Sequence, residues 1–216
     1  MKKIEPTKRT RVVREPHRGV YDRDASYAIL DEALVCHIGF MVDGQPYVIP
    51  TLFARVDDII YFHGSAASRM LRHLGAGTSM SLTVTLVDGI VLARSVFNHS
   101  INYRSVVVLG NATVVDDAAS KRQALEAFTE KLLAGRWGDA RPPTENELAA
   151  TSVLRLPLDE FSAKVRTGPP IDKDEDLALP VWAGVLPLRV VAGAPIPDAG
   201  CDPKLTAPRF DRFERI

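Results

Sequence analysis

The sequence predicts a mainly β fold: a closed antiparallel β-barrel with two or three peripheral helices. Three observations support this fold class: a series of short apolar runs bounded by turn residues, few segments with helical periodicity, and no alternation of strand and helix along the chain. A doubly wound sheet needs that alternation, whereas short strands joined by tight turns are typical of antiparallel barrels. A chain of 216 residues is long enough to bury one such core.

The first predicted strands form a meander joined by tight turns. We expect strands over residues 35–41, 47–54 and 59–62, with turns at Asp43-Gly44 and at Asp57-Asp58. These turn residues accept the backbone conformations that hairpin connections require, so consecutive strands are expected to pair as neighbours.

The later strands follow from alternation and from turn signals. In residues 81–87, apolar side chains alternate with Thr83 and Thr85, which indicates a strand with one wetter face. Further strands are predicted over residues 90–96 after a hairpin turn at Asp88-Gly89, over residues 105–115 with a break at Gly110, and over residues 154–156 and 163–165.

Two helices are predicted from a capping aspartate followed by an apolar stripe. Asp24 precedes Tyr27, Leu30 and Leu34, and Asp116 or Asp117 precedes Leu125, Phe128 and Leu132. The aspartate oxygen can accept the free N–H groups of the first turn, and the stripe spacing places the apolar side chains on one face.

The most informative segment is residues 61–71, where an apolar strand breaks at Gly64 and is followed by hydroxyls and an arginine. Phosphate binding needs outward N–H groups, hydroxyl donors and a cation, and Ser65, Ser68 and Arg69 supply the side chains at the start of a predicted third helix. The alternative is a helix capped by Ser65 or Ser68 that binds nothing.

Composition narrows the class of protein. We expect a soluble cytoplasmic protein, because no apolar run is long enough to cross a bilayer and no charged-then-apolar leader follows Met1. Cys36 and Cys201 are far apart and form no CxxC pair, which argues against a disulfide framework or a thiolate zinc site. The net charge of zero gives no indication of nucleic-acid binding.

Three regions are expected along the chain: a basic N-terminal arm (residues 1–20), a barrel domain (residues 21–167) and a proline-rich C-terminal extension (residues 168–216). The default expectation for the arm is a solvated basic segment. The density of prolines in the extension disfavours long helices or central strands there. Because it also carries Trp182, we expect the extension to pack on the barrel or on a partner subunit.

The order of these parts resembles the pyridoxamine 5′-phosphate oxidase-like FMN-binding split barrels. The resemblance covers roughly residues 21–167 and begins with the apolar strand of residues 48–52. Its most specific pieces are His63-Gly64-Ser65 with Ser68-Arg69, and residues 102–110, whereas the remaining strands are generic. Within the family, the chain is most similar to the branch of 5-nitroimidazole-resistance and flavin-nucleotide-binding proteins. The resemblance implies a split β-barrel that binds FMN, in a homodimer with the flavin sites at the subunit interface.

The resemblance also implies the residues of the flavin site. Ile49, Pro50 and Thr51 would line the flavin ring, His63, Gly64, Ser65, Ser68 and Arg69 would surround the phosphate, and Arg104 and Ser105 would approach from the neighbouring strand. The chain departs from the oxidases at Met70, where they carry a second cationic residue, a lysine. This departure disfavours the vitamin B6 oxidase itself.

His63 has two interpretations. A histidine at the end of an apolar strand is typically a core or interface residue. The resemblance instead implies a place beside the flavin, where His63 would be catalytic and donate a proton to the substrate. Heme-binding relatives of the fold use a histidine ligand, which makes His63 or His99 the candidate in that case. The other histidines show no metal-ligand spacing, and we assign no metal site.

Lys164 and Arg166 alternate onto one strand face, which indicates a solvated edge or a second anion contact. For the whole chain, we predict an FMN-binding flavoprotein that acts as a flavin-dependent oxidoreductase on a small organic substrate, nitroreductase-like or pyridoxamine-phosphate-oxidase-like. The alternatives are a non-catalytic flavin-binding or sensor module, a heme-binding protein on the same barrel, and FAD or a deazaflavin in place of FMN. A homodimer is expected because a lone barrel would expose Val106, Val108 and the tail around Trp182.

Overall fold

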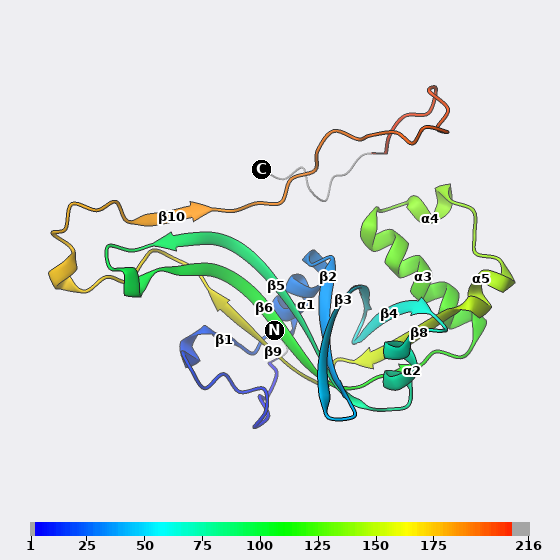
Figure 1. The fold of residues 1–216 in the computed structure, drawn as a ribbon, viewed down its shortest axis with the longest axis horizontal. Helices are drawn as coiled ribbons and strands as arrows, with labels where there is room; N and C mark the ends of the chain where they lie inside the picture. The colour runs from blue at the N-terminus through cyan, green and yellow to red at the C-terminus, as the bar shows by residue number, and fades with distance from the viewer. Residues whose placement is uncertain (1–2, 209–216) are drawn as a thin grey trace.

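One antiparallel sheet curls round the main core in the computed structural model, the first helix (residues 23–32) packs into that core, and the other helices lie toward one end of the molecule (Figure 1). The structure describes residues 3–208; residues 1–2 of the predicted arm and 209–216 of the predicted extension lie outside the described residues. The strands are β1 (Gly19–Val20), β2 (Val35–Val42), β3 (Gln45–Val56), β4 (Ile59–Ser65), β5 (Ser79–Leu92), β6 (Ser100–Asn111), β7 (Thr113–Val114), β8 (Thr151–Pro157), β9 (Glu160–Arg166) and β10 (Gly184–Pro187). The helices are α1 (Arg23–Glu32), α2 (Arg69–Gly75), α3 (Ala118–Leu132), α4 (Arg136–Asp139) and α5 (Glu145–Ala150), with short 3-10 turns η1 (Pro16–Arg18), η2 (Val96–Asn98) and η3 (Asp174–Asp176).

The mainly β, antiparallel prediction is confirmed, but the hydrogen-bonded ladder is not closed. The strand order is β1-β9-β6-β5-β2-β3-β4-β8-β7, with β10 added beside β5, and no pairing among the described strands joins β1 to β7. The sheet still encloses its core, because buried side chains of β2, β4, β6 and β8 belong to one cluster. A Cβ on Gly110 of β6 would lie 3.0 Å from the Leu156 side chain of β8, so these two strands approach each other closely without pairing.

Five helices form where two or three were predicted. Asp22, rather than Asp24, caps α1 by accepting from the Ala25 N–H at 2.8 Å, and Asp117 caps α3 as predicted. The two missed helices, α4 and α5, have four and six residues. Helices this short cannot display a 3.6-residue apolar period. The available signal for α5 was the capping box of Thr144 and Glu147, which the structure forms.

The predicted hairpin turn at Asp88-Gly89 is wrong. β5 continues through both residues as a single 14-residue strand, with a register shift against β6 between Val87 and Gly89. The glycine serves close packing, because a Cβ there would lie 3.0 Å from Val185 and 3.1 Å from the Leu186 carbonyl of β10. The result is a long β5–β6 ribbon that extends beyond the core and carries β10 on its edge (Figure 1).

The exposed apolar face of the sheet differs from the predicted one. Val106 and Val108 are fully buried in the core, so the prediction that they are exposed is wrong, whereas Trp182 is exposed as predicted. Their neighbour Val107 points outward, and Val35, Met41 and Val48 share that outer face through the pairing of β2 with β3 and β5. Met41 is 56% exposed and Val48 67%, which leaves an apolar surface on the side of the sheet away from the core.

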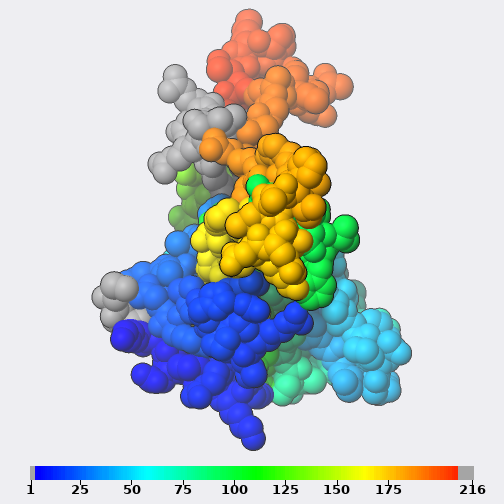
Figure 2. Space-filling model, turned by 90° about the vertical axis from the view of Figure 1, so that its left-hand side faces the viewer, coloured from blue at the N-terminus to red at the C-terminus, as the bar shows by residue number. Residues whose placement is uncertain are grey.

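The two terminal regions behave differently from each other. The N-terminal arm contacts β9 while most of its basic side chains stay exposed: Arg9, 66% exposed, forms an ion pair with Glu160, and Lys164 Nζ donates to the Arg14 carbonyl at 3.1 Å. The C-terminal extension contributes β10, but its residues 188–208 are exposed and run past the body of the molecule (Figures 1 and 2). No helix in residues 3–208 is long and apolar enough to span a membrane.

Candidate functional site

The β4–α2 turn has the side chains expected of an anion site. The Ser65 hydroxyl oxygen accepts from the Ala67 N–H at 3.1 Å, and the Ser68 oxygen caps α2 by accepting from the Leu71 N–H. Because both oxygens are used as acceptors, their hydroxyl protons remain able to donate to a ligand. Gly64 lets the turn pack on α2, since a Cβ there would lie 3.1 Å from the Leu71 side chain.

Arg69 joins this turn to β3. Its guanidinium lies over the Tyr47 ring, 4.7 Å from the centroid, and among the described residues no carboxylate forms a salt bridge with it. The exposed cation is therefore available to an anionic group. Met70 points the other way: it is 8% exposed and belongs to the main core, so the lysine of the oxidases cannot be accommodated here without placing a charge among apolar side chains.

The predicted ring-contacting residues of β3 divide between the two faces of the sheet. Ile49 and Thr51 alternate with exposed neighbours and lie partly buried on the same face as Tyr47. Pro50 faces the outer side, paired with His37 of β2. Arg69 therefore shares a face with Ile49 and Thr51, and Pro50 does not.

Arg104 and Ser105 also lie on opposite faces of their strand. The Arg104 guanidinium donates to Asp88 at 2.7 and 2.9 Å and to Glu32 at 2.8 Å. These hydrogen bonds raise the pKa of Arg104, and the one to Glu32 has the largest effect. Ser105 Oγ donates to the Lys164 carbonyl at 3.2 Å on the outer side. The structure thus engages Arg104 with two carboxylates instead of leaving it free like Arg69.

His63 lies on the side of β4 that faces α3. Its ring centroid is 4.3 Å from that of Phe128, and its Nδ1 atom is buried without a hydrogen-bond partner among the described residues. Burial lowers the pKa of His63 below its ordinary value, so the imidazole is neutral at neutral pH. A neutral ring with an unpartnered nitrogen can bind a metal centre, but it is poorly suited to donate a proton.

His73 is a candidate that sequence reasoning missed. It lies on α2 one turn after Arg69, and its Nε2 atom is buried without a hydrogen-bond partner among the described residues. Its ring centroid is 5.9 Å from that of Phe40. The i, i+4 spacing from Arg69 was the available signal, because residues four apart share a helix face. The other predicted candidate, His99, is exposed in a loop with Nδ1 3.0 Å from the Ser95 carbonyl.

The acidic, histidine and cysteine side chains of residues 3–208 are scattered rather than clustered. No group of three or more histidine, cysteine, aspartate or glutamate residues gathers there to hold a metal ion. Both cysteines are free, and burial raises the pKa of Cys36 to about 12, which keeps its thiol protonated.

Comparison with known proteins places this geometry in a family. Residues 22–165 match the family described as pyridoxamine 5′-phosphate oxidase. The flavocytochrome Anf3 from Azotobacter vinelandii is 42% identical over 95% of both chains, with a TM-score of 0.89. The FAD and heme binding protein from Mycobacterium smegmatis is 37% identical over 88% of this chain and 94% of its own, with a TM-score of 0.85.

A more distant solved structure shares the fold alone. It is a proposed 5-nitroimidazole antibiotic resistance protein from Bacteroides thetaiotaomicron, 22% identical over 68% of this chain and 86% of its own, with a TM-score of 0.56. No curated protein matches the chain. The match over residues 22–165 and the two similarities over nearly the whole chain show that the chain belongs to the pyridoxamine 5′-phosphate oxidase family, with its flavin-binding fold.

Proposed function

We propose that the protein is a flavin-dependent oxidoreductase that also holds a heme. The observation that carries this proposal is similarity over nearly the whole chain, 42% and 37% identity, to one protein named a flavocytochrome and another named for FAD and heme binding. The similarity to the flavocytochrome covers 95% of this chain, so it includes segments outside residues 22–165, which match the family model. We propose a small organic molecule as the substrate.

The flavin phosphate is assigned to the β4–α2 turn. Arg69 supplies the cation, and the Ser65 and Ser68 hydroxyls supply donors. Helix α2 has only seven residues, so the assignment depends on these side chains rather than on a helix dipole. Ile49 and Thr51 lie on the same face of β3 as Tyr47, against which Arg69 packs, and would hold the flavin ring.

We propose FAD rather than FMN alone as the bound form. The residues described above would contact only the FMN half of FAD, which both cofactors contain. The adenylate half is supported by the name of the full-length relative that binds FAD and heme. Titration of flavin-free protein with FMN and with FAD tests this choice, and tighter binding of FMN would contradict it.

His63 is the proposed heme ligand. Its neutral, partly buried imidazole beside Phe128, with one nitrogen unpartnered among the described residues, fits an axial ligand to heme iron. The same lowered pKa argues against His63 as the general acid expected from the resemblance. When bound, the flavin supplies hydride transfer and the heme supplies single-electron transfer. The chain itself would orient both groups and exclude water from them.

The absorption spectrum of the purified protein tests the two cofactors together. We expect flavin bands and a Soret band, with bleaching of the flavin by a reduced nicotinamide. His63→Ala should remove the Soret band and keep the flavin bands, whereas the control His99→Ala should keep both. A Soret band that survives in His63→Ala refutes the ligand assignment, and a wild-type spectrum without flavin bands refutes the function.

We also propose a homodimer assembled through the outer face of β2, β3, β5 and β6. The exposed Met41, Val48 and Val107 support it, because an exposed apolar face of this kind is typical of an interface. Pro50 and Ser105 lie on the same face, where a second copy would place them beside its flavin. Val48→Glu should give a monomeric mass in light scattering. The control Val13→Glu, at an exposed residue outside the sheet, should not.

A further inference from the structure

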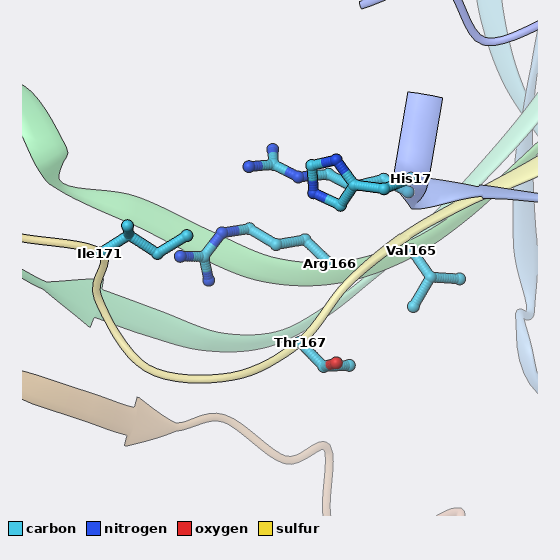
Figure 3. Close-up of a pocket in the computed structure, with 6 residues that line it drawn as sticks. His17, Val165, Arg166, Thr167 and Ile171 are labelled. Carbon is cyan, nitrogen blue, oxygen red and sulfur yellow. The ribbon is translucent and has the colours of Figure 1, made fainter. Parts of the chain in front are cut away.

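A cleft beside the start of β1 and the end of β9 is lined by cationic side chains. Its volume is about 170 Å³, and its lining residues are His17, Arg18, Val165, Arg166, Thr167 and Ile171 (Figure 3). Two arginines and a histidine therefore meet in one hollow, and the lining includes no acidic side chain. The cleft belongs to neither the β4–α2 turn nor the surroundings of His63.

Arg166 is the buried member of this cluster. It is 6% exposed, which contradicts the expectation of a solvated edge for Lys164 and Arg166. Its guanidinium donates to the Asn102 side-chain oxygen, to the Gly168 carbonyl at 3.4 Å and to the Pro169 carbonyl at 3.2 Å. All these acceptors are neutral, and no carboxylate among the described residues forms a salt bridge with Arg166. A buried cation in a protein is ordinarily paired with an anion.

Arg18 brings a second positive charge to the same hollow. Burial lowers the pKa of the Arg166 guanidinium, and the charge of Arg18 lowers it further. One carboxylate is close: Glu15 Oε2 lies 3.5 Å from Arg18 Nη2 and 3.6 Å from His17 Nε2. The Glu15 side chain is 40% exposed, so solvent screens this pairing. A single carboxylate at the rim leaves two guanidiniums with a net positive charge.

We propose that this cleft binds a phosphate or carboxylate group carried by a small organic molecule. An anion between Arg18 and Arg166 would relieve their mutual repulsion and accept charge-assisted hydrogen bonds. The volume would hold roughly ten water molecules, more than one inorganic phosphate needs. Ile171 offers apolar contact for the rest of the ligand, whereas the Val165 side chain points away from Arg166 and packs against the main core (Figure 3).

The site is separate from the proposed flavin phosphate site. β1 and β9 stand at one end of the strand order and β4 near the other, and Figure 1 shows α2 and β1 on different sides of the molecule. The proposal therefore does not depend on the flavin assignment, and the anionic group has two possible sources. It belongs either to a cofactor that the protein carries or to a free metabolite.

The test uses the purified protein with its bound cofactors. Inorganic phosphate, adenosine 5′-monophosphate and succinate are titrated calorimetrically into wild type, Arg18→Gln and the control Arg14→Gln, which removes an exposed arginine of the same arm. For a free metabolite, we expect one of the organic probes to bind more tightly than phosphate and to lose about tenfold or more in affinity in Arg18→Gln alone.

For an anion that belongs to a bound cofactor, we expect the probes to be excluded and Arg18→Gln to lose cofactor absorbance, with Arg14→Gln unchanged. Equal probe affinities and equal cofactor content in wild type and Arg18→Gln would overturn the proposal. Arg69→Ala separates the two sites: a loss of flavin in that variant, with probe binding retained, leaves each site supported on its own.

Discussion

Replacement of Arg69 by alanine tests the flavin phosphate site most directly. The Arg69 side chain is exposed, has no salt bridge among the described residues and contacts the Tyr47 ring from 4.7 Å. Loss of an exposed cation–π contact costs the fold about 0.5–1 kcal/mol. Arg69→Ala should therefore fold and melt nearly as wild type does, so that a change in flavin affinity reports on binding.

The expected loss of affinity follows from one charge-assisted contact. A hydrogen bond to a charged group contributes about 1.5–3 kcal/mol, which corresponds to roughly tenfold to hundredfold weaker flavin binding. The lysine of the oxidases is absent, so no second cation of the motif compensates. Fluorescence titration of flavin-free protein with FAD and FMN measures the effect for both cofactors.

Arg72→Ala is the matched control. Arg72 is an exposed arginine in the last turn of the same short helix, so its removal changes the net charge equally without touching the turn. Flavin affinity should be unchanged in this variant. An Arg69→Ala protein that binds flavin as tightly as wild type, or an equal loss in both variants, would refute the assignment of the phosphate to this turn.

Three further outcomes are expected. Met70→Lys should lower the unfolding free energy by about 2–5 kcal/mol in urea titrations and give no gain in flavin affinity, because the side chain lies in the core. Burial holds the pKa of His63 in the folded protein below its value in the unfolded chain, so the unfolded state binds more protons in acid. The free energy of unfolding should therefore fall as the pH drops from about 7 to about 5, and it should fall less steeply in His63→Gln. Gly89→Val should detach β10, making the chain after β9 sensitive to limited proteolysis, whereas Gly138→Ala, with open space at its Cβ, should not.

Local patterns in the sequence were sufficient for much of the fold. The alternation of apolar residues and the turn at Asp43-Gly44 predicted β2 and β3 closely, and Ser68 and Asp117 were among the predicted helix caps. These features depend on residues close together in the chain, where side-chain period and backbone preference act directly. The errors at Asp88-Gly89 and at Val106 have the opposite origin. Bulges and hairpin turns favour the same residue types, so the pair Asp88-Gly89 fits both. The contact that requires Gly89 is with β10, which lies nearly a hundred residues further along the chain.

The sequence by itself determined the strand series, the family resemblance and the identity of the residues in the β4–α2 turn. Only the tertiary structure decided which of those residues act together. It placed Arg69 on Tyr47, engaged Arg104 with two carboxylates, turned Met70 into the core and left Arg166 buried beside Arg18. The physical reason is that the charge state and availability of a side chain depend on partners that the fold brings from distant positions, and no local period or propensity encodes those partners.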